Sequence, residues 1–253
     1  MPRLELHSKR EQGLAKTEEY FNSIRTNIQF SGNDLKTIVI TSVQPNEGKS
    51  TTSVSLANSF ATAGFKTLLI DADLRNSVIT GSFLALERYE GLTSYLTGNV
   101  GITEIFCSTN IDNLVVIPSG QKSPNPTSLL QNAQFDQLLQ KARSIFDYII
   151  IDSPPIGLVI DSAIIANQCD ASLLVVEAGA IKRRFVQKAV EQMTQSGTPF
   201  LGVILNKVDL TKEKYGVYGN YGSYGNYGKK LETKKETKKA KKSKRKTRSR
   251  ASR

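Results

Sequence analysis

Three short polar stretches of the chain carry residue types that could bind phosphate and a metal ion. The first is Gly48-Lys49-Ser50, which lies between an apolar run and an amphipathic segment. A Gly-Lys-Ser triplet between a strand and a helix is typical of a P-loop, whose backbone N–H groups and helix N-terminus hold phosphates. Lys49 would reach the β- and γ-phosphates and Ser50 would ligate Mg²⁺. Val43 replaces the first glycine of the full pattern, so the triplet depends on its neighbouring strand and helix for support.

The other two stretches place aspartates directly after apolar runs. Asp71 and Asp73 follow the run at 67–70, and Asp152 follows the run at 148–151. A strand-terminal aspartate is typical of the Walker B residue that holds Mg²⁺, although aspartate is also common in ordinary turns. Because parallel strands bring their carboxyl ends to one edge of a sheet, the three stretches together favour a single site for phosphate and Mg²⁺.

Alternating apolar runs and amphipathic segments must position these residues. From Lys36 onward the pattern repeats as strand, loop and helix, and several strands are continuous runs of Ile, Leu and Val. Such strands are buried on both faces, as in a parallel sheet covered by helices. We therefore predict an α/β fold with a doubly wound, mostly parallel sheet, of the P-loop NTPase type. We expect Asp161 to be a helix N-cap rather than a catalyst, with a role near the site as the alternative. Strands are expected at 37–41, 67–70, 114–117, 148–151, 171–176 and 201–205, and helices at 50–63, 127–144 and 181–196.

Composition divides the chain into four predicted segments. The first 16 residues are polar and are expected to be frayed, whereas 17–30 have helical spacing with Thr17 as a plausible N-cap. The predicted segments are an N-terminal segment at 1–34, a nucleotide-binding core at 35–212, a tyrosine-rich tail at 213–228 and a disordered basic tail at 229–253.

Charge separates the basic tail from the rest of the chain. Residues 229–253 hold 14 Lys and Arg against 2 Asp and Glu, a net of +12, so residues 1–228 carry a net of −1. The whole-chain charge of +11 therefore does not indicate a basic nucleic-acid-binding domain. Three interpretations of the tail itself stay open: a solvated end, a contact with an anionic membrane surface, or a contact with nucleic acid.

Cysteine usage and hydropathy indicate the compartment. Cys107 and Cys169 lie outside any CxxC pattern and are expected to be reduced, packed thiols. The first residues contain no apolar signal core, and no apolar run approaches the roughly 18 residues of a membrane span. We therefore expect a cytosolic chain.

A periodic tyrosine segment precedes the basic tail. Between 215 and 228 a tyrosine recurs at every third position and is followed each time by glycine. Val217 is its one aliphatic residue, so the segment cannot build a core. It is either a low-complexity linker that stacks on bases or an accessible substrate for autophosphorylation. The candidate acceptors are Tyr215, Tyr218, Tyr221, Tyr224 and Tyr227.

Taken together, these motifs resemble those of the bacterial tyrosine kinases. The order is Gly-Lys-Ser, an apolar run ending in Asp-x-Asp-x-Arg, another ending in Asp-Ser-Pro-Pro, and then a tyrosine cluster. The narrower likeness is to the separate cytoplasmic kinase subunit of Gram-positive capsule and exopolysaccharide systems. It covers about residues 17–228 and includes GLTSYL at 91–96 and the PSG…PNP…LL run at 118–130.

The resemblance implies a role for each site residue, with ATP and Mg²⁺ as cofactors. Asp71 and Asp152 help to position Mg²⁺, and Asp73 is the base that faces the tyrosine hydroxyl. A carboxylate with a pKa near ~4 is a weak base for a phenol near ~10, so orienting the nucleophile and binding metal is the alternative role of Asp73. The catalytic set is Lys49, Asp71, Asp73 and Asp152, and the metal set is Ser50, Asp71, Asp73 and Asp152. Nucleotide contacts fall on Asn46, Glu47, Gly48, Lys49, Ser50, Thr51, Arg75 and Asn206, the last of these at the adenine.

The resemblance also implies partners. The family's helical E-x-x-R-x-x-R oligomerisation motif corresponds to Glu19 through Arg25, with Asn22 in place of the first arginine. We expect a homo-oligomeric ring whose neighbours exchange tails, a transmembrane adaptor that recruits the kinase to the inner face of the membrane, and a cognate phosphotyrosine phosphatase. Five phosphotyrosines would add about −8 to −10 charges and nearly cancel the basic tail, which would release that tail from an anionic membrane surface or fold it onto its own phosphates.

The main alternative is a positioning ATPase of the kind that partitions plasmids or places division sites. It shares the expected fold, but it uses hydrolysis as a switch and phosphorylates no protein. Such proteins usually carry a signature lysine four residues before the P-loop glycine, where this chain has Gln44, and they lack a terminal tyrosine cluster. Both differences favour the kinase.

Overall fold

The computed structural model describes residues 1–32 and 34–209. Contacts between residues group Met1–Val208 into one unit. The tyrosine-rich segment, the basic segment and the boundary predicted at 212 lie outside the described residues, so the division into four segments stays a prediction. None of the helices in the described part has the length and hydrophobicity needed to cross a membrane.

A nine-stranded sheet runs through this unit of the described chain, in the order β4-β1-β5-β6-β3-β7-β2-β8-β9. Neighbouring strands are parallel except in the β1–β4 and β5–β6 pairs, which are antiparallel. The predicted α/β fold with a mostly parallel sheet is therefore confirmed. The strands span Arg3–Leu6 (β1), Thr37–Ser42 (β2), Thr67–Asp71 (β3), Phe83–Ala85 (β4), Cys107–Thr109 (β5), Leu114–Ile117 (β6), Tyr148–Asp152 (β7), Ala171–Glu177 (β8) and Phe200–Asn206 (β9).

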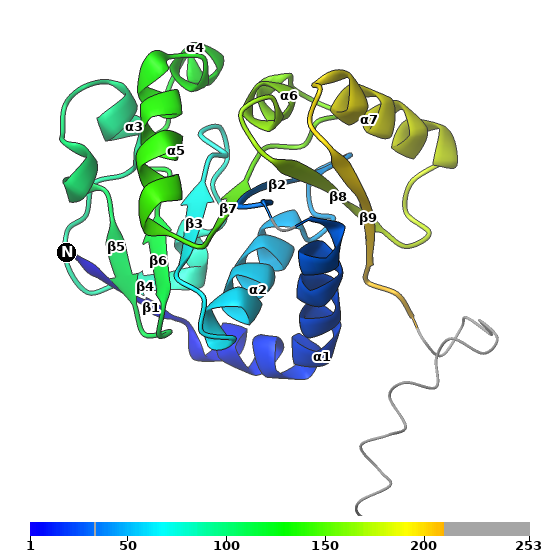
Figure 1. Ribbon diagram of the computed structural model, residues 1–253, viewed down its shortest axis with the longest axis horizontal. Helices are drawn as coiled ribbons and strands as arrows, with labels where there is room; N and C mark the ends of the chain where they lie inside the picture. The colour runs from blue at the N-terminus through cyan, green and yellow to red at the C-terminus, as the bar shows by residue number, and fades with distance from the viewer. Residues whose placement is uncertain (33, 210–253) are drawn as a thin grey trace, which may run out of the picture. The chain divides into compact units, whose positions relative to one another are not determined.

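Helices cover both faces of the sheet, as in a doubly wound fold (Figure 1). Helices α1 and α2 share one apolar cluster with the strands, and α3 to α7 share the other. Side chains alternate along β2, because Ile38 and Ile40 join the first cluster and Val39 joins the second. The helices span Ser8–Ser31 (α1), Lys49–Thr62 (α2), Leu92–Leu96 (α3), Pro126–Leu130 (α4), Ala133–Ile145 (α5), Asp161–Ala166 (α6) and Arg183–Gln195 (α7), with short 3₁₀ turns at Thr80–Ser82 (η1) and Ile102–Glu104 (η2).

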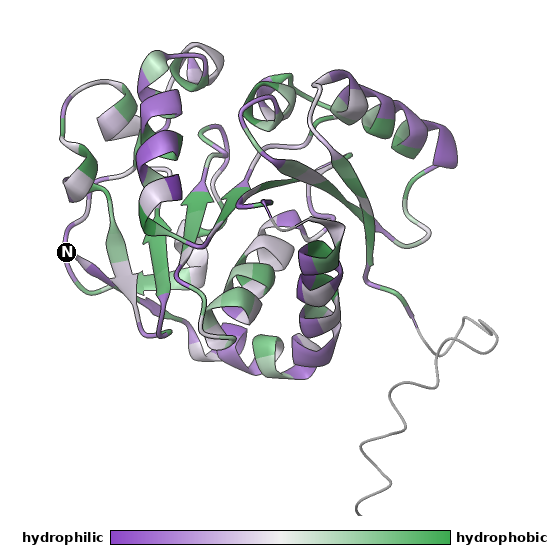
Figure 2. Cartoon of the chain, viewed as in Figure 1, coloured by the Kyte–Doolittle hydropathy of each residue, from purple (hydrophilic) through white to green (hydrophobic). Residues whose placement is uncertain are grey.

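Hydropathy explains why the central strands could be predicted. Figure 2 shows β3, β6 and β7 as mostly hydrophobic, whereas α5 and α7 carry hydrophilic stretches. Every residue of β2 and of β3 is buried, which is the condition that produces a continuous apolar run. Each of the six predicted strands is present, and its ends lie within one residue of the predicted positions.

The prediction for the N-terminus was wrong. Residues 1–16 are not frayed, because β1 pairs with β4 and β5 and α1 begins at Ser8. Leu4 and Leu6 are only 3% and 4% exposed, so tertiary packing orders a segment whose local composition is polar. Thr17 lies inside α1 and is not its N-cap; its hydroxyl donates to the carbonyl of Gly13 at 3.1 Å.

The helix predicted at 127–144 is in fact two helices, α4 and α5. The chain leaves helical geometry at Asn132, whose side chain accepts a hydrogen bond from the N–H of Gln134 and caps α5. Asparagine favours such a cap because its carbonyl oxygen satisfies a free N–H of the first helical turn. The strands β4 and β5 were not predicted, because three residues are too few to show an alternating pattern.

Candidate nucleotide and metal site

The loop between β2 and α2 is shaped around Gly48. This glycine has a φ of 93° and directly precedes α2, and a Cβ at this position would lie 2.0 Å from Nδ2 of Asn206. That amide donates to the carbonyl of Glu47 at 2.8 Å. The left-handed backbone and the close approach together restrict the position to glycine.

Glu47 holds the loop rather than facing a ligand. Its side chain is almost fully buried, with one oxygen accepting from the N–H of Gln44 at 2.6 Å and the other from the N–H of Glu177 at 3.1 Å. The side chains of Glu47 and Asn206 therefore hydrogen-bond to backbone groups. The backbone N–H of Glu47 is the group of that residue that could still bind a phosphate. The predicted contact of Asn206 with adenine stays a prediction.

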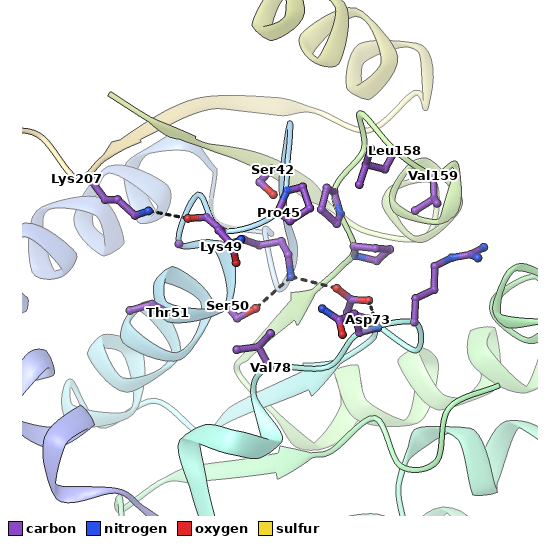
Figure 3. A pocket seen from close by; sticks show the side chains of 16 residues that line it. Ser42, Pro45, Lys49, Ser50, Thr51, Asp73, Val78, Leu158, Val159 and Lys207 are labelled. Atoms are coloured by element: carbon purple, nitrogen blue, oxygen red, sulfur yellow. Dashed lines mark hydrogen bonds and ion pairs between the residues drawn. The ribbon is translucent and has the colours of Figure 1, made fainter. Parts of the chain in front are cut away.

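Lys49 lies between two carboxylates, one at the end of β7 and one two residues beyond the end of β3. Its Nζ is 2.9 Å from Oδ2 of Asp152 and 3.8 Å from Oδ2 of Asp73, and Figure 3 shows it pointing toward Ser50 and Asp73. Asp152 also accepts hydrogen bonds from the hydroxyls of Ser50 and Ser53, each at 2.8 Å. The predicted strand-end residues thus converge, because β3 and β7 are parallel neighbours with Asp71 opposite Asp152.

Asp71 is the most perturbed carboxyl of the site. Burial raises its pKa to about 7, and the neighbouring charge of Asp152 adds to the rise, while a hydrogen bond from the hydroxyl of Ser77 and the charge of Lys49 oppose it. The Ser77 hydroxyl donates to Asp71 at 2.5 Å. The buried group retains its proton into the neutral range in the absence of a metal cation, because ionising a carboxyl away from water is costly.

A hollow of about 380 Å³ opens in front of Lys49. Six of the eight predicted nucleotide contacts line it, and so does the predicted base Asp73. The other two contacts, Glu47 and Asn206, do not line it. The predicted metal ligands Asp71 and Asp152 do not line it either. The carboxylate that faces the hollow directly is therefore Asp73, and its second oxygen accepts from the N–H of Asn76 at 2.9 Å. The six are Asn46, Gly48, Lys49, Ser50, Thr51 and Arg75.

Arg75, in the loop after β3, lines this hollow and is fixed by a residue of α6. Its Nε and Nη2 donate to the two carboxylate oxygens of Asp161 at 2.7 and 3.1 Å, and Thr127 donates to the same carboxylate at 2.7 Å. The hydrogen bond to Asp161 raises the pKa of Arg75, so the guanidinium stays charged. Asp161 begins α6, but its side chain caps no helix N–H; the expected N-cap is instead an anchor for Arg75.

Lys207 is a pocket residue that the sequence did not single out. It lines the hollow, and its Nζ donates to the carbonyl of Asn46 and to Oε2 of Glu177, both at 2.7 Å. The signal for it was present in the sequence Asn206-Lys207-Val208-Asp209, in which Lys207 directly follows a predicted nucleotide contact. In the structure the first residue of that pair supports the loop and the second reaches the hollow.

The donor set suits magnesium. The Ser50 hydroxyl and the carboxylates of Asp71, Asp73 and Asp152 are oxygen ligands, which Mg²⁺ prefers. Among residues 1–32 and 34–209, no group of three or more His, Cys, Asp or Glu side chains is arranged to hold a metal ion by itself. A magnesium ion would therefore complete its coordination with phosphate oxygens and water, as it usually does in nucleotide sites.

The residues predicted at the oligomer interface lie on α1. Arg25 is directed at α2, where its Nη1 donates to the carbonyl of Ser59 at 2.6 Å and to Oδ1 of Asn22 at 3.0 Å. Glu19 is exposed. In this conformation Arg25 joins two helices of one chain, and the interface stays a prediction. The five candidate phosphoacceptor tyrosines lie outside the part of the chain that the structure describes.

Comparison with known proteins places the chain in a family. The model of the AAA domain family matches residues 35–197. The chain therefore belongs to this class of P-loop nucleotide-binding proteins, as the site geometry indicates.

Its similarity to curated proteins is narrower. The chain is 60% identical to tyrosine-protein kinase CpsD of Streptococcus agalactiae over 216 residues, which are 85% of this chain and 93% of that protein. It is 39% identical to tyrosine-protein kinase YwqD of Bacillus subtilis over 78% of this chain and 84% of that protein. The chain thus belongs to the bacterial tyrosine-protein kinases, and its enzyme class is protein-tyrosine kinase.

Solved structures agree with this assignment. The kinase domain of Escherichia coli tyrosine kinase ETK is 30% identical, with a TM-score of 0.71 over 80% of each chain. The chimerical protein CapA2B2 is 34% identical, with a TM-score of 0.72 over 75% of this chain and 84% of that one. The septum site-determining protein MinD of Pyrococcus horikoshii is 20% identical, with a TM-score of 0.57 over 67% of this chain and 69% of that one, so it shares the fold alone.

Proposed function

We propose that the chain transfers the γ-phosphate of ATP to the tyrosines of its own C-terminal cluster, and that this regulates capsular or exopolysaccharide synthesis and export. The observation that carries the proposal is the position of Lys49 between Asp152 and Asp73 at the wall of the hollow. Phosphoryl transfer needs a cation on the phosphates and a carboxylate near the attacking oxygen, and this arrangement offers both.

Each residue has a defined task in this reaction. The N–H groups at the start of α2 bind phosphate oxygens, and Lys49 exchanges its bond to Asp152 for the β- and γ-phosphates. Asp73, which faces the hollow, orients the tyrosine hydroxyl. It accepts the hydroxyl proton as the tyrosine oxygen bonds to the γ-phosphorus and the bond from that phosphorus to the bridging oxygen breaks, with ADP as the leaving group. Mg²⁺, when bound, neutralises phosphate charge. Its protein ligands would be the Ser50 hydroxyl and the carboxylates of Asp71, Asp73 and Asp152.

The proposed setting follows the family resemblance. A transmembrane adaptor activates the kinase and recruits it from the cytoplasm to the membrane, and neighbouring subunits of a homo-oligomeric ring phosphorylate each other's tails through an α1 interface with Glu19 and Arg25. A phosphotyrosine phosphatase resets the cluster. The basic tail provides a further contact with anionic lipid, which phosphorylation weakens because each phosphotyrosine adds about −1.5 to −2 charges.

The test is a labelling experiment on the full chain. The protein is incubated with Mg²⁺, γ-labelled ATP and the cytoplasmic segment of a candidate adaptor, and phosphotyrosine is mapped by mass spectrometry. Label is expected on the tyrosines of 215–227 and is expected to be lost in Lys49→Met and in Asp73→Ala. Tyr20, whose side chain is 61% exposed, is the internal comparison: equal label there would contradict a preference for the cluster.

One other outcome would replace the proposal. Steady release of phosphate without labelled protein would identify a switch-type ATPase, and the tyrosine segment would then be a binding segment.

A further inference from the structure

The beginning of α1 lies beside the phosphate-binding end of α2. Nη1 of Arg10 donates to the hydroxyl of Thr51 at 3.1 Å. Thr51 is the third residue of α2 and lines the hollow in front of Lys49. It also lines a second hollow of about 230 Å³, whose walls include Arg10. The two hollows share Thr51, so Arg10 is separated from the nucleotide site by a single side chain.

This segment is fixed by strand pairing and by hydrogen bonds to Ser82 and Asn110. β1 pairs with β4 and β5, the N–H of His7 donates to the carbonyl of Ser82 at 3.1 Å, and Oε1 of Glu11 accepts from Nδ2 of Asn110 at 2.8 Å. Arg10 itself is partly exposed. Its Cα is therefore held close to the site, and its side chain reaches from there to Thr51.

Arg10 differs in its ion pairing from the cations that line the nucleotide hollow. The cations that line the nucleotide hollow each contact a carboxylate: Lys49 contacts Asp152, Arg75 contacts Asp161 and Lys207 contacts Glu177. Within the described part of the chain, Arg10 forms no ion pair with an acidic side chain. Among the described residues, its side chain hydrogen-bonds to the neutral hydroxyl of Thr51 alone, although a guanidinium carries five N–H donors.

We propose that Arg10 is a nucleotide-binding residue. Its guanidinium turns from the hydroxyl of Thr51 to a phosphate oxygen of ATP bound at the start of α2. Arginine suits this role because its donors form short, charge-assisted hydrogen bonds to phosphate, and the N-terminus of α2 already favours an anion at this point. The inference rests on the proposed ATP-dependent function and adds to it a residue from the N-terminal segment.

Calorimetric titration of the full chain with Mg²⁺–ATP and with adenosine tests the proposal. Arg10→Gln is expected to weaken ATP binding about tenfold, the effect of losing one hydrogen bond to a charged group at a partly exposed site. Arg10→Lys keeps the charge and is expected to recover part of the affinity. Adenosine binding is expected to be the same in all variants, because adenosine has no phosphate.

Lys16→Gln is the matched control, because it removes one positive charge from an exposed part of the same helix outside both hollows. It is expected to change ATP affinity less than twofold. An unchanged affinity in Arg10→Gln, or an equal loss in Lys16→Gln, would overturn the proposal. Tighter binding in Arg10→Gln would overturn it too, because the bond to Thr51 would then be an obstruction.

Two further measurements separate this inference from the function on which it rests. Urea unfolding without nucleotide is expected to give the same midpoint for Arg10→Gln and the wild type, which shows that the variant is folded. Absence of ATP binding by the wild type would overturn both the proposed function and this inference. Normal wild-type binding with no effect of Arg10→Gln would overturn the inference alone.

Discussion

Gly48→Ala is predicted to destabilise the nucleotide-free protein through two separable effects. The backbone of Gly48 has a φ of 93°, where a side chain costs about 1–2 kcal/mol. The new Cβ would also lie 2.0 Å from Nδ2 of Asn206, so the amide must move and lose its bond to the carbonyl of Glu47, at a cost of about 1 kcal/mol. The expected total loss in the free energy of unfolding is about 2–3 kcal/mol.

Gly64→Ala is a closely matched control. Gly64 has the same φ of 93°, but a Cβ there would meet no atom within 4 Å, so its expected loss is the conformational part alone, about 1–2 kcal/mol. Asn206→Ala by itself is expected to cost about 1 kcal/mol. Added to Gly48→Ala, it is expected to cost nothing further, because the bond from Asn206 to Glu47 is already broken.

Urea unfolding without nucleotide measures each loss from the midpoint and slope of the transition. The double-mutant cycle between positions 48 and 206 isolates the contact from the backbone effect. Equal losses in Gly48→Ala and Gly64→Ala would refute the reasoning, since the contact with Asn206 would then contribute nothing. Additive losses in Gly48→Ala and Asn206→Ala would refute it as well.

Three more predictions concern buried ionisable groups. Asp71 has a folded pKa of about 7 against about 3.9 in an unfolded chain. The free energy of unfolding of the nucleotide-free protein is therefore expected to fall by up to about 4 kcal/mol as pH rises from 4 to 7. Asp71→Asn is expected to flatten that fall, as measured by urea unfolding at each pH. Asp161→Asn weakens the hydrogen bonds to Arg75 and is expected to cost about 2 kcal/mol, seen as a lower Tm. Burial raises the pKa of Cys107 to about 11 and also raises that of Cys169, so neither thiol is expected to react with a disulfide reagent at pH 8 until the protein is unfolded.

Each of these three has a result that contradicts it. A pH slope that persists in Asp71→Asn would assign the proton to another group. An unchanged Tm in Asp161→Asn would mean that its carboxylate contributes little to fixing Arg75. Rapid modification of either cysteine in native protein would contradict the close packing around the thiol.

The sequence was sufficient to predict the residues at and just beyond the ends of the central strands. Asp152 ends β7, Asp73 lies two residues beyond β3, and Lys49 begins the helix that follows β2. The apolar runs of these strands are predictable because burial on both faces removes polar side chains from the strand. Parallel pairing then brings the strand ends together without further information. The position of Lys49 near both carboxylates follows from these two facts.

The direction of individual loop side chains could not be predicted in the same way. Glu47 and Asn206 are expected to contact nucleotide, and those contacts stay predictions. What the sequence did not indicate is that their side chains bond to backbone groups of Gln44 and Glu177 and of Glu47 itself. In two of these three hydrogen bonds the bonded residues are far apart in the sequence: 130 residues separate Glu47 from Glu177 and 159 separate it from Asn206. No local sequence pattern encodes such contacts. The order of the first 16 residues was missed for the same reason, since pairing with β4 and β5 outweighs a polar composition.

The pairing of Lys49 with Asp152 has a consequence for how the ligands of the site depend on one another. Phosphates that draw Lys49 away leave the buried carboxylate of Asp152 without its ion-pair partner and facing additional negative charge, whereas a divalent cation compensates that charge. Metal and nucleotide are therefore thermodynamically linked: each increases the affinity for the other by the same factor. ATP without its divalent cation is therefore expected to bind weakly. In the nucleotide-free site the Lys49 ammonium neutralises Asp152, and it can leave that carboxylate for the phosphates only when a metal cation arrives with them.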